Sequence, residues 1–289
     1  MVKFLNDIKE YMIDGKRLYF SPAYANQLDV FKKRIKVDYD NIFLVTGMEG
    51  TGKSRGISIP TAFYLSGKNI VIVFTWEQFL EEYNKMTTGG TIIWDEFVLA
   101  GMGVDALSEM QKNLVKTMAT GRETHLVNVI LIVPSIFLLK NYFAVHRALC
   151  QIHTDSPDFL RRGYAYFYSY ENKRILYNLN KKTQYTNLNM CSFGFAFAEQ
   201  EEELYDMEKY TTMKKQAIES LRDKEKEESP ENVKRLWFKN RFMMDNCDDI
   251  LSMETKEIAA RWEVTVRTAQ LWKNYTKNLL IAKESNQII

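Results

Sequence analysis

Residues 42–54 read IFLVTGMEGTGKS, an apolar run that passes directly into a glycine-rich one. A short run of β-branched and aromatic residues is typical of a strand. Over residues 56–65 the apolar side chains then recur at helical spacing. The stretch therefore predicts a strand, a tight loop and a helix in succession. The loop itself carries the spacing G-x-x-x-x-G-K-S between residues 47 and 54.

This spacing is that of a phosphate-binding loop, or P-loop. Glycines let successive backbone N–H groups curl around an anion, and the helix that follows points the positive end of its dipole to the same place. The lysine reaches the β- and γ-phosphates of ATP, and the serine hydroxyl binds Mg²⁺. A turn that only caps a helix is the alternative, but it needs no Lys-Ser pair after its last glycine. The residues predicted to bind Mg²⁺ and ATP here are Gly47, Gly50, Thr51, Gly52, Lys53 and Ser54.

An acidic pair, Asp95 and Glu96, follows the apolar run of residues 91–94. Four apolar residues and two acids form the Walker B pattern, which gains weight because a complete P-loop precedes it. We expect Asp95 to organise Mg²⁺ through its water shell, and Glu96 to polarise the attacking water. A glutamate in that place favours hydrolysis of ATP by water over phosphate transfer to a small acceptor.

Hydrolysis also benefits from a cation on the γ-phosphate, which a neighbouring subunit often supplies. Arg122 follows Gly121 after a helical pattern, and Arg147 opens a later strand-like run. Either arginine could act in trans, and we favour Arg122. The alternative is that both are ordinary surface arginines.

Strand-like and helical patterns alternate through the first half of the chain. The strand-like runs are 42–45, 69–75, 91–94 and 127–133, and the helical ones are 56–65, 76–83 and 106–118. This alternation predicts an α/β fold with a parallel, doubly wound sheet flanked by helices. Residues 147–154, 163–170 and 174–179 also read as strands. We expect the last two to form a hairpin at the edge of the sheet, with its turn at residues 171–173.

Together these motifs carry a resemblance to a known class of enzymes. Residues 47–54, 94–96 and 121–133 resemble the additional-strand, catalytic-glutamate P-loop ATPases, and among them the HerA–FtsK branch and the zonular-occludens-toxin-like ATPases of phages and mobile elements. The resemblance covers about residues 38–180. It implies an ATPase that assembles into a ring or filament. It also implies a polar γ-phosphate sensor after the fourth strand, where this chain has Pro134 and then Ser135. We expect Ser135 to act as this sensor with a shorter side chain. The alternative is that this protein has no γ-phosphate sensor.

A second motif lies in the tail, where residues 255–275 read TKEIAARWEVTVRTAQLWKNY. The run resembles the helix-turn-helix of small DNA-binding domains. Predicted to face inward are Ile258, Ala259, Trp262, Val264, Val266, Ala269 and Trp272, with Thr265 as the cap of the second helix. Glu263 holds the turn position that favours glycine. The side chains predicted to contact DNA are Arg267, Thr268, Gln270 and Lys273. A helical hairpin used for protein contact is the alternative.

Composition bounds the remaining choices. The chain has 289 residues, 46% of them hydrophobic, with a net charge of +2, so any surface that binds nucleic acid must be local. Its three cysteines lie far apart, which suits neither a disulfide framework nor a zinc site and indicates a reducing cytosol. The most apolar stretch, residues 126–139, is interrupted and too short to span a bilayer. We expect a cytoplasmic protein without a membrane span.

These patterns predict three regions and one main function. The regions are a P-loop ATPase domain over residues 1–185, a charged helical connector over 186–231, and an all-α helix-turn-helix domain over 232–289. We expect a homo-oligomeric ATPase that acts as a motor on DNA, double-stranded more than single-stranded, in phage or mobile-element packaging, translocation or mobilisation. Two alternatives remain: an AAA+-like nucleotide-switched regulator of replication or transposition, and a morphogenesis ATPase that acts on protein.

Overall fold

The computed structural model describes residues 4–5, 7–95, 97, 104–121, 126–156, 163–198, 200, 203–217, 219 and 241–284. The chain divides into two compact units, Met1–Glu219 and Ser220–Ile289. The first unit thus extends past residue 185, where the sequence had placed the end of the ATPase domain. Residues 186–219, which the sequence assigned to a connector, contribute a strand and a helix to this unit.

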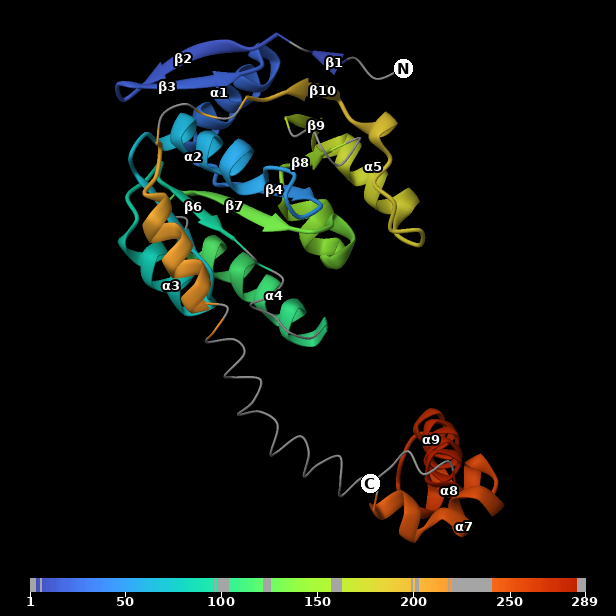
Figure 1. Cartoon of the computed structure of the whole chain (residues 1–289). Helices are drawn as coiled ribbons and strands as arrows, with labels where there is room; N and C mark the ends of the chain where they lie inside the picture. Colours follow the sequence, from blue (N-terminus) through green and yellow to red (C-terminus); the bar gives the residue numbers. More distant parts are fainter. Residues whose placement is uncertain are drawn as a thin grey trace. The chain divides into compact units, whose positions relative to one another are not determined.

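The first unit is built on a mixed sheet of eight strands with helices on both faces (Figure 1). The strand order is β1-β10-β9-β8-β4-β7-β6-β5. The strands are β1 (Phe4–Leu5), β4 (Asn41–Gly47), β5 (Ile70–Val73), β6 (Thr91–Trp94), β7 (Asn128–Val133), β8 (Cys150–Asp155), β9 (Tyr164–Tyr168) and β10 (Phe193–Ala196). Neighbours from β8 to β5 pair in parallel, whereas β9 is antiparallel to both β8 and β10. A separate hairpin consists of β2 (Lys9–Ile13) and β3 (Lys16–Phe20).

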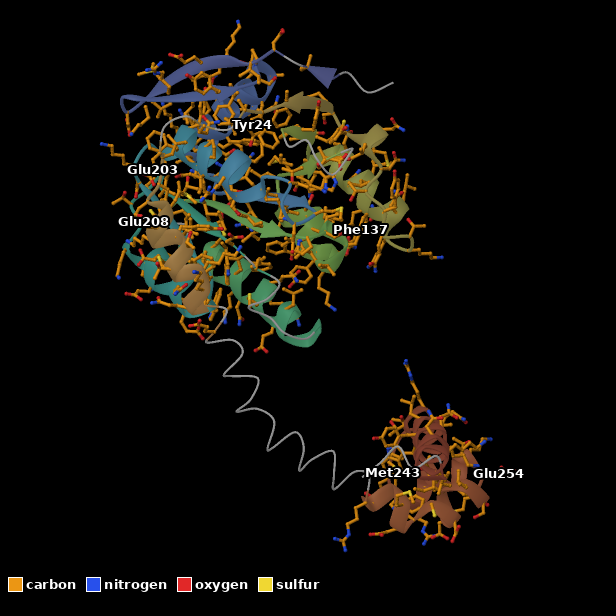
Figure 2. The ribbon with its side chains drawn as sticks, viewed as in Figure 1. Tyr24, Phe137, Glu203, Glu208, Met243 and Glu254 are labelled. Atoms are coloured by element: carbon orange, nitrogen blue, oxygen red, sulfur yellow. The ribbon has the colours of Figure 1, made fainter. Side chains whose placement is uncertain are left out.

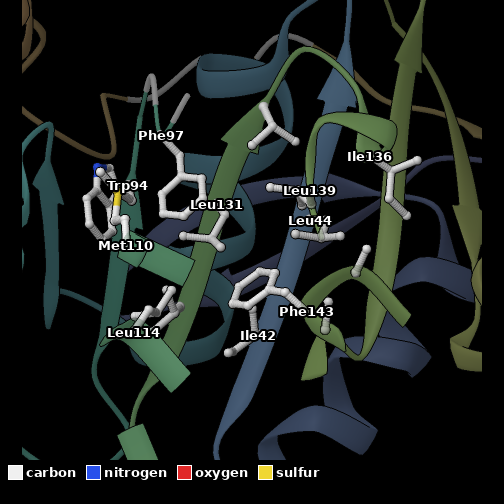
Figure 3. Close-up of a cluster of buried hydrophobic side chains, with 14 of the residues drawn as sticks. Ile42, Leu44, Trp94, Phe97, Met110, Leu114, Leu131, Ile136, Leu139 and Phe143 are labelled. Atoms are coloured by element: carbon white, nitrogen blue, oxygen red, sulfur yellow. The ribbon is translucent and has the colours of Figure 1, made fainter. Parts of the chain in front are cut away.

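The central strands are covered on both faces, which explains their continuous apolar sequences. Every residue of β4 and of β7 is buried. On one face they meet α3 (Trp76–Lys85) and α4 (Val104–Thr120), and Figure 3 shows Ile42, Leu44 and Leu131 within this cluster. On the other face they meet α1 (Pro22–Lys36) and α2 (Ile59–Ser66). The predicted α/β architecture with a mostly parallel sheet is confirmed.

Two more regular helices of the first unit lie in its described part, α5 (Tyr170–Asn180) and a helix over residues 207–217. Shorter turns accompany them: the π-helical turns η1 (Lys53–Ser58) and η5 (Tyr142–Arg147), and the 3₁₀ turns η4 (Ile136–Leu138) and η6 (Leu188–Met190). Among the described residues, none of the helices has both the length and the apolar character that a membrane crossing needs.

One predicted strand is wrong. Residues 174–179 belong to α5, which begins at Tyr170. Ser169 caps this helix, since its hydroxyl accepts from the Asn172 backbone N–H. Lys173, Leu176 and Tyr177 are buried, and their i, i+3, i+4 spacing makes one helical face. The Lys173 ammonium donates to the carbonyl oxygens of Ala144 and Val145, which ties α5 to η5. The antiparallel edge of the sheet is therefore made by β8, β9 and β10 instead.

The second unit is a small bundle of α7 (Cys247–Ser252), α8 (Thr255–Arg261) and α9 (Val266–Glu284), preceded by a helical segment at residues 241–245. Its buried cluster consists of Met243, Ile250, Ile258 and Ala269, and Figure 2 labels Met243. Trp262 and Trp272 pack against this cluster with their ring centroids 6.1 Å apart. Aromatic and aliphatic side chains from all three helices thus share one core.

Candidate functional site

A glycine-rich loop, residues 47–52, joins the carboxyl end of β4 to η1. Gly47, Gly50 and Gly52 have φ angles of 138°, 80° and 95°, a region that side chains with a Cβ rarely adopt. At Gly47 there is also no room, because an added Cβ would lie 2.3 Å from the carbonyl oxygen of Thr154 on β8. The glycine at this position is therefore required by both backbone angle and packing.

Lys53 folds back over the loop. Its ammonium donates to the carbonyl oxygens of Gly47 and Met48, both at 2.7 Å. Thr51 is buried beneath, where its hydroxyl donates to the Met48 carbonyl oxygen at 2.8 Å and lies 2.7 Å from the Thr154 hydroxyl. The loop thus encloses a positive charge, and backbone carbonyl oxygens accept both of these bonds.

Ser54 and Asp95, the two residues predicted to hold Mg²⁺, lie together. The Ser54 hydroxyl donates to Oδ2 of Asp95 at 3.1 Å. Asp95 directly follows β6 and is 1% exposed, and its backbone N–H donates to the Val73 carbonyl oxygen. Mg²⁺ prefers oxygen ligands and commonly takes one or two from the protein and the rest from water and phosphate. A hydroxyl and a carboxylate at this separation fit that requirement.

These residues open onto a pocket of about 430 Å³. Its lining residues are Glu49, Gly50, Gly52, Lys53, Ser54, Arg55, Asp95, Tyr210 and Lys214. The volume lies within the range of pockets that bind small molecules. Tyr210 and Lys214 were not predicted, because they lie on the helix over residues 207–217, in the segment that the sequence assigned to a connector. Their apolar neighbours Met207, Met213 and Ala217 recur at helical spacing, which could have indicated a packed helix.

The helix over residues 207–217 contacts the Asp95 carboxylate directly. The Tyr210 hydroxyl donates to Oδ2 at 2.5 Å, and the Lys214 ammonium lies 3.7 Å from the same oxygen. Burial raises the pKa of Tyr210 to about 12, and the negative charge of Asp95 acts in the same direction. The phenol therefore stays protonated at neutral pH and remains a hydrogen-bond donor to Asp95.

Phe197 covers the other side of the loop. It is 7% exposed, and its backbone N–H donates to the Gly163 carbonyl oxygen. A Cβ added at Gly56 would lie 2.3 Å from Cε2 of this ring, and one at Gly52 would lie 3.2 Å from it. The segment after β10 therefore contacts the site twice. Phe197 packs on the glycine-rich loop, and the helix over residues 207–217 contacts Asp95.

We expect Gly56→Ala to lower the free energy of unfolding by about 1–3 kcal/mol, because the new methyl group collides with a buried ring. Adding Phe197→Leu, which shortens the opposing side chain, should recover part of this loss. Urea unfolding of the two single variants and the double variant measures the coupling. Strictly additive effects would show that Phe197 does not pack on Gly56.

His153 on β8 lies beneath the loop, where its Nδ1 is 2.9 Å from the Thr46 hydroxyl. Burial lowers the pKa of His153 to about 4; Asp155 opposes this shift, and the charge of Lys53 adds to it. An unfolded chain would bind a proton at this histidine near pH 6.5, whereas the folded chain binds it only near pH 4. Folded-state stability that is present above pH 6.5 is therefore lost as the pH falls toward 4.

This linkage predicts that the free energy of unfolding falls by an amount on the order of 1–3 kcal/mol between pH 6.5 and pH 4 because of His153. His153→Gln should remove it, so that the variant loses less stability than the parent over this range. His146→Gln is the matched control, since His146 is exposed, and it should retain the full acid-induced loss. Urea unfolding at pH 7 and pH 4.5 makes the comparison. Identical pH dependence in the parent and in His153→Gln would contradict the assignment.

The remaining predicted residues of this site have different positions. Glu96 and Arg122 lie outside the described residues. The Ser135 hydroxyl accepts from the Phe137 backbone N–H at 3.3 Å and caps η4; Ser135 does not line the described part of the pocket. Arg147 forms an ion pair with Asp40. Asp40 precedes β4, so this pair lies at the opposite end of that strand from Gly47.

In the second unit, the turn between α8 and α9 covers residues 262–265. Thr265 caps α9 as predicted, since its hydroxyl accepts from the Thr268 backbone N–H at 3.1 Å. Glu263 has a φ of 51°, the left-handed conformation for which glycine is favoured. The prediction that Val266 faces inward is wrong, because it is 52% exposed. Val266 lies three residues before the buried Ala269, in the first turn of α9, and its side chain does not reach the core.

The predicted DNA contacts on α9 differ in accessibility. Arg267 and Gln270 are exposed, whereas Thr268 is half-buried at the cap. Lys273 is half-buried, and its ammonium donates to the Met253 carbonyl oxygen between α7 and α8. The sequence of α9, VRTAQLWKNYTKNLLIAKE, holds four basic residues and one acid. A basic helix with an exposed Arg267 and Gln270 is thus available to an acidic partner.

Comparisons of this chain with protein-family models, curated proteins and solved structures found no match. We therefore infer function from the residues that the fold brings together.

Proposed function

We propose that this chain is an ATP-hydrolysing P-loop protein that acts on DNA. The observation that carries the proposal is the convergence of Lys53, Ser54 and Asp95 on one pocket. Ser54 and Asp95 are 41 residues apart in the chain and are joined by a hydrogen bond. The pocket lies beyond the carboxyl ends of β4 and β6, which is where α/β sheets generally bind ligands.

The order of the strands supports the additional-strand class of P-loop ATPases. β7 lies between β4, which leads into the glycine-rich loop, and β6, which leads into Asp95. An additional strand thus separates the strand that leads into the loop from the strand that leads into Asp95. The parallel partner β8 then flanks β4 on its other side.

Each residue of the site has a separate role in the proposed hydrolysis. The N–H groups of the loop and the Lys53 ammonium bind the phosphates, with Lys53 exchanging its bonds to Gly47 and Met48 for phosphate oxygens. Ser54 and Asp95 hold Mg²⁺, which neutralises charge on the β- and γ-phosphates. Glu96, adjacent to Asp95 in sequence, polarises the attacking water. Arg122 of a neighbouring copy supplies a further cation, in a ring or filament.

The second unit supplies the contact to DNA. We propose that α8 and α9 form a helix-turn-helix and that the first turns of α9 enter the major groove of double-stranded DNA. Arg267 and Gln270 are exposed for this role. The Gln270 amide would first have to leave the Thr255 hydroxyl, and Lys273 the Met253 carbonyl. We place the activity in the cytoplasm, in DNA packaging, translocation or mobilisation by a phage or mobile element. The buried free thiols of Cys150 and Cys191 suit a reducing compartment.

The test is ATP hydrolysis by the full chain at low salt, without DNA and with double- or single-stranded DNA. We expect double-stranded DNA to raise the rate several-fold, and Glu96→Gln to abolish hydrolysis with or without DNA. The double variant Arg267→Ala, Gln270→Ala should keep the basal rate and lose the stimulation. Hydrolysis that is indifferent to DNA would contradict a DNA motor and favour a nucleotide switch or a morphogenesis ATPase. A folded chain that does not hydrolyse ATP would contradict the ATPase itself.

A further inference from the structure

The helix over residues 207–217 packs against the rest of the first unit through a buried face. Figure 1 shows it in orange; it follows β10 in the chain but lies on the side of the sheet where β6 lies, far from β10. Tyr210 is 8% exposed, and its ring centroid is 5.9 Å from that of Phe74, just after β5. Met207 and Met213 pack against the same cluster, while Glu208, labelled in Figure 2, is exposed. The buried face fixes which side chains of this helix reach the pocket.

Lys214 is the basic side chain that this packing directs into the pocket. Its side chain is 30% exposed, and its ammonium lies 3.7 Å from Oδ2 of Asp95. The next residue, Lys215, is exposed and does not line the pocket. The pocket therefore receives basic side chains from two separate segments: Lys53 and Arg55 at the loop, and Lys214 from a helix about 160 residues later in the chain.

Three polar side chains of the pocket converge on one carboxylate oxygen of Asp95. The hydroxyls of Ser54 and Tyr210 and the ammonium of Lys214 all approach Oδ2. If Asp95 engages a magnesium ion, that positive charge repels the ammonium nearby. Lys214 has a flexible four-carbon stem and can turn to another anion within reach. In the proposed ATPase, that anion is the triphosphate.

We propose that Lys214 is a phosphate-binding residue, supplied by the same chain, that contacts the terminal phosphate of bound ATP. The inference rests on the proposed function and deepens it. The loop N–H groups and Lys53 line one side of the pocket, whereas Lys214 enters it beside Asp95, where it would add a second cation to the one that Lys53 offers the γ-phosphate. A contact to the γ-phosphate is absent when ADP is bound. Lys214 therefore distinguishes ATP from ADP and adds a cation to the site without a second subunit.

The test is calorimetric titration of the full chain with Mg²⁺-ATPγS and, separately, with Mg²⁺-ADP. We expect Lys214→Ala to weaken binding of ATPγS at least about tenfold and binding of ADP less than about twofold. Lys214→Met, which keeps the stem but not the charge, should behave in the same way. Lys214→Arg should recover most of the affinity for ATPγS. Lys215→Ala is the matched control and should leave both affinities unchanged.

The outcomes separate this inference from the function on which it rests. If the parent chain binds both nucleotides, and Lys214→Ala and Lys214→Met change both affinities equally or change neither, the inference is overturned and the proposed function stands. If the folded parent chain binds neither nucleotide, both are overturned. Selective loss of ATPγS affinity in both variants, with recovery in Lys214→Arg, establishes the γ-phosphate contact.

Discussion

Replacing Lys53 with alanine is expected to lower kcat/KM for ATP hydrolysis by at least about 100-fold, the scale at which one preorganised electrostatic contact to a reacting group acts. The ammonium already lies within the glycine-rich loop, bonded to the carbonyl oxygens of Gly47 and Met48. Its charge is therefore in place before any phosphate arrives. Alanine leaves the loop backbone but removes the cation.

The fold should survive this change, because the two carbonyl groups released in Lys53→Ala lie beside a pocket that water can enter. Steady-state phosphate release measures the activity, and thermal unfolding confirms that the variant is folded. Lys182→Ala is the matched control, since Lys182 is exposed in the turn after α5 and should leave the rate unchanged. A folded Lys53→Ala variant with a rate within threefold of the parent would contradict the role of this residue.

Gly47→Ala is expected to have the largest effect on stability, a loss of about 2–4 kcal/mol in the free energy of unfolding. The added Cβ would lie 2.3 Å from the carbonyl oxygen of Thr154, and β8 cannot withdraw without breaking its pairing with β4. The backbone at Gly47 also has a φ of 138°, which alanine adopts only with strain.

Gly50→Ala separates these two contributions. Gly50 has a φ of 80° in the same loop, but an added Cβ meets no heavy atom within 4 Å. Its substitution should cost about 1 kcal/mol, from the backbone alone. Urea unfolding with an unchanged m value measures both variants. Equal losses in the free energy of unfolding of the two variants would show that the close approach of Thr154 does not contribute to the effect of Gly47→Ala.

The local sequence pattern correctly predicted the elements whose structure is set by residues close together in the chain. The apolar runs before the glycine-rich loop and before Asp95 were predicted as strands, and both are strands, buried along their whole length. Because parallel strands end at the same edge of a sheet, Ser54 and Asp95 could be expected to meet there, and they do. Thr265 was predicted as a helix cap from its place in the turn, and its hydroxyl makes that bond.

The parts that were not predicted depend on packing between distant segments. Residues 174–179 read RILYNL, a run too short for its periodicity to distinguish a strand from a helix. Only burial of Lys173, Leu176 and Tyr177 on one face selects the helix. The contact of Tyr210 with Asp95 joins residues 115 positions apart, and no local pattern indicates which surface an amphipathic helix will cover. Lys273 likewise bonds a carbonyl 20 residues away, at Met253.

The most direct test of the central claim is whether the pocket formed by residues 47–54, Asp95 and the helix over residues 207–217 binds a magnesium–nucleoside triphosphate. Equilibrium titration of the full chain with Mg²⁺-ATPγS measures this, with Lys53→Ala as its comparison. The predicted result is one site per chain, with a dissociation constant on the order of 1–100 μM and affinity at least about 100-fold weaker in Lys53→Ala. A folded parent chain that binds no triphosphate, or that binds it equally well in Lys53→Ala, would contradict the account.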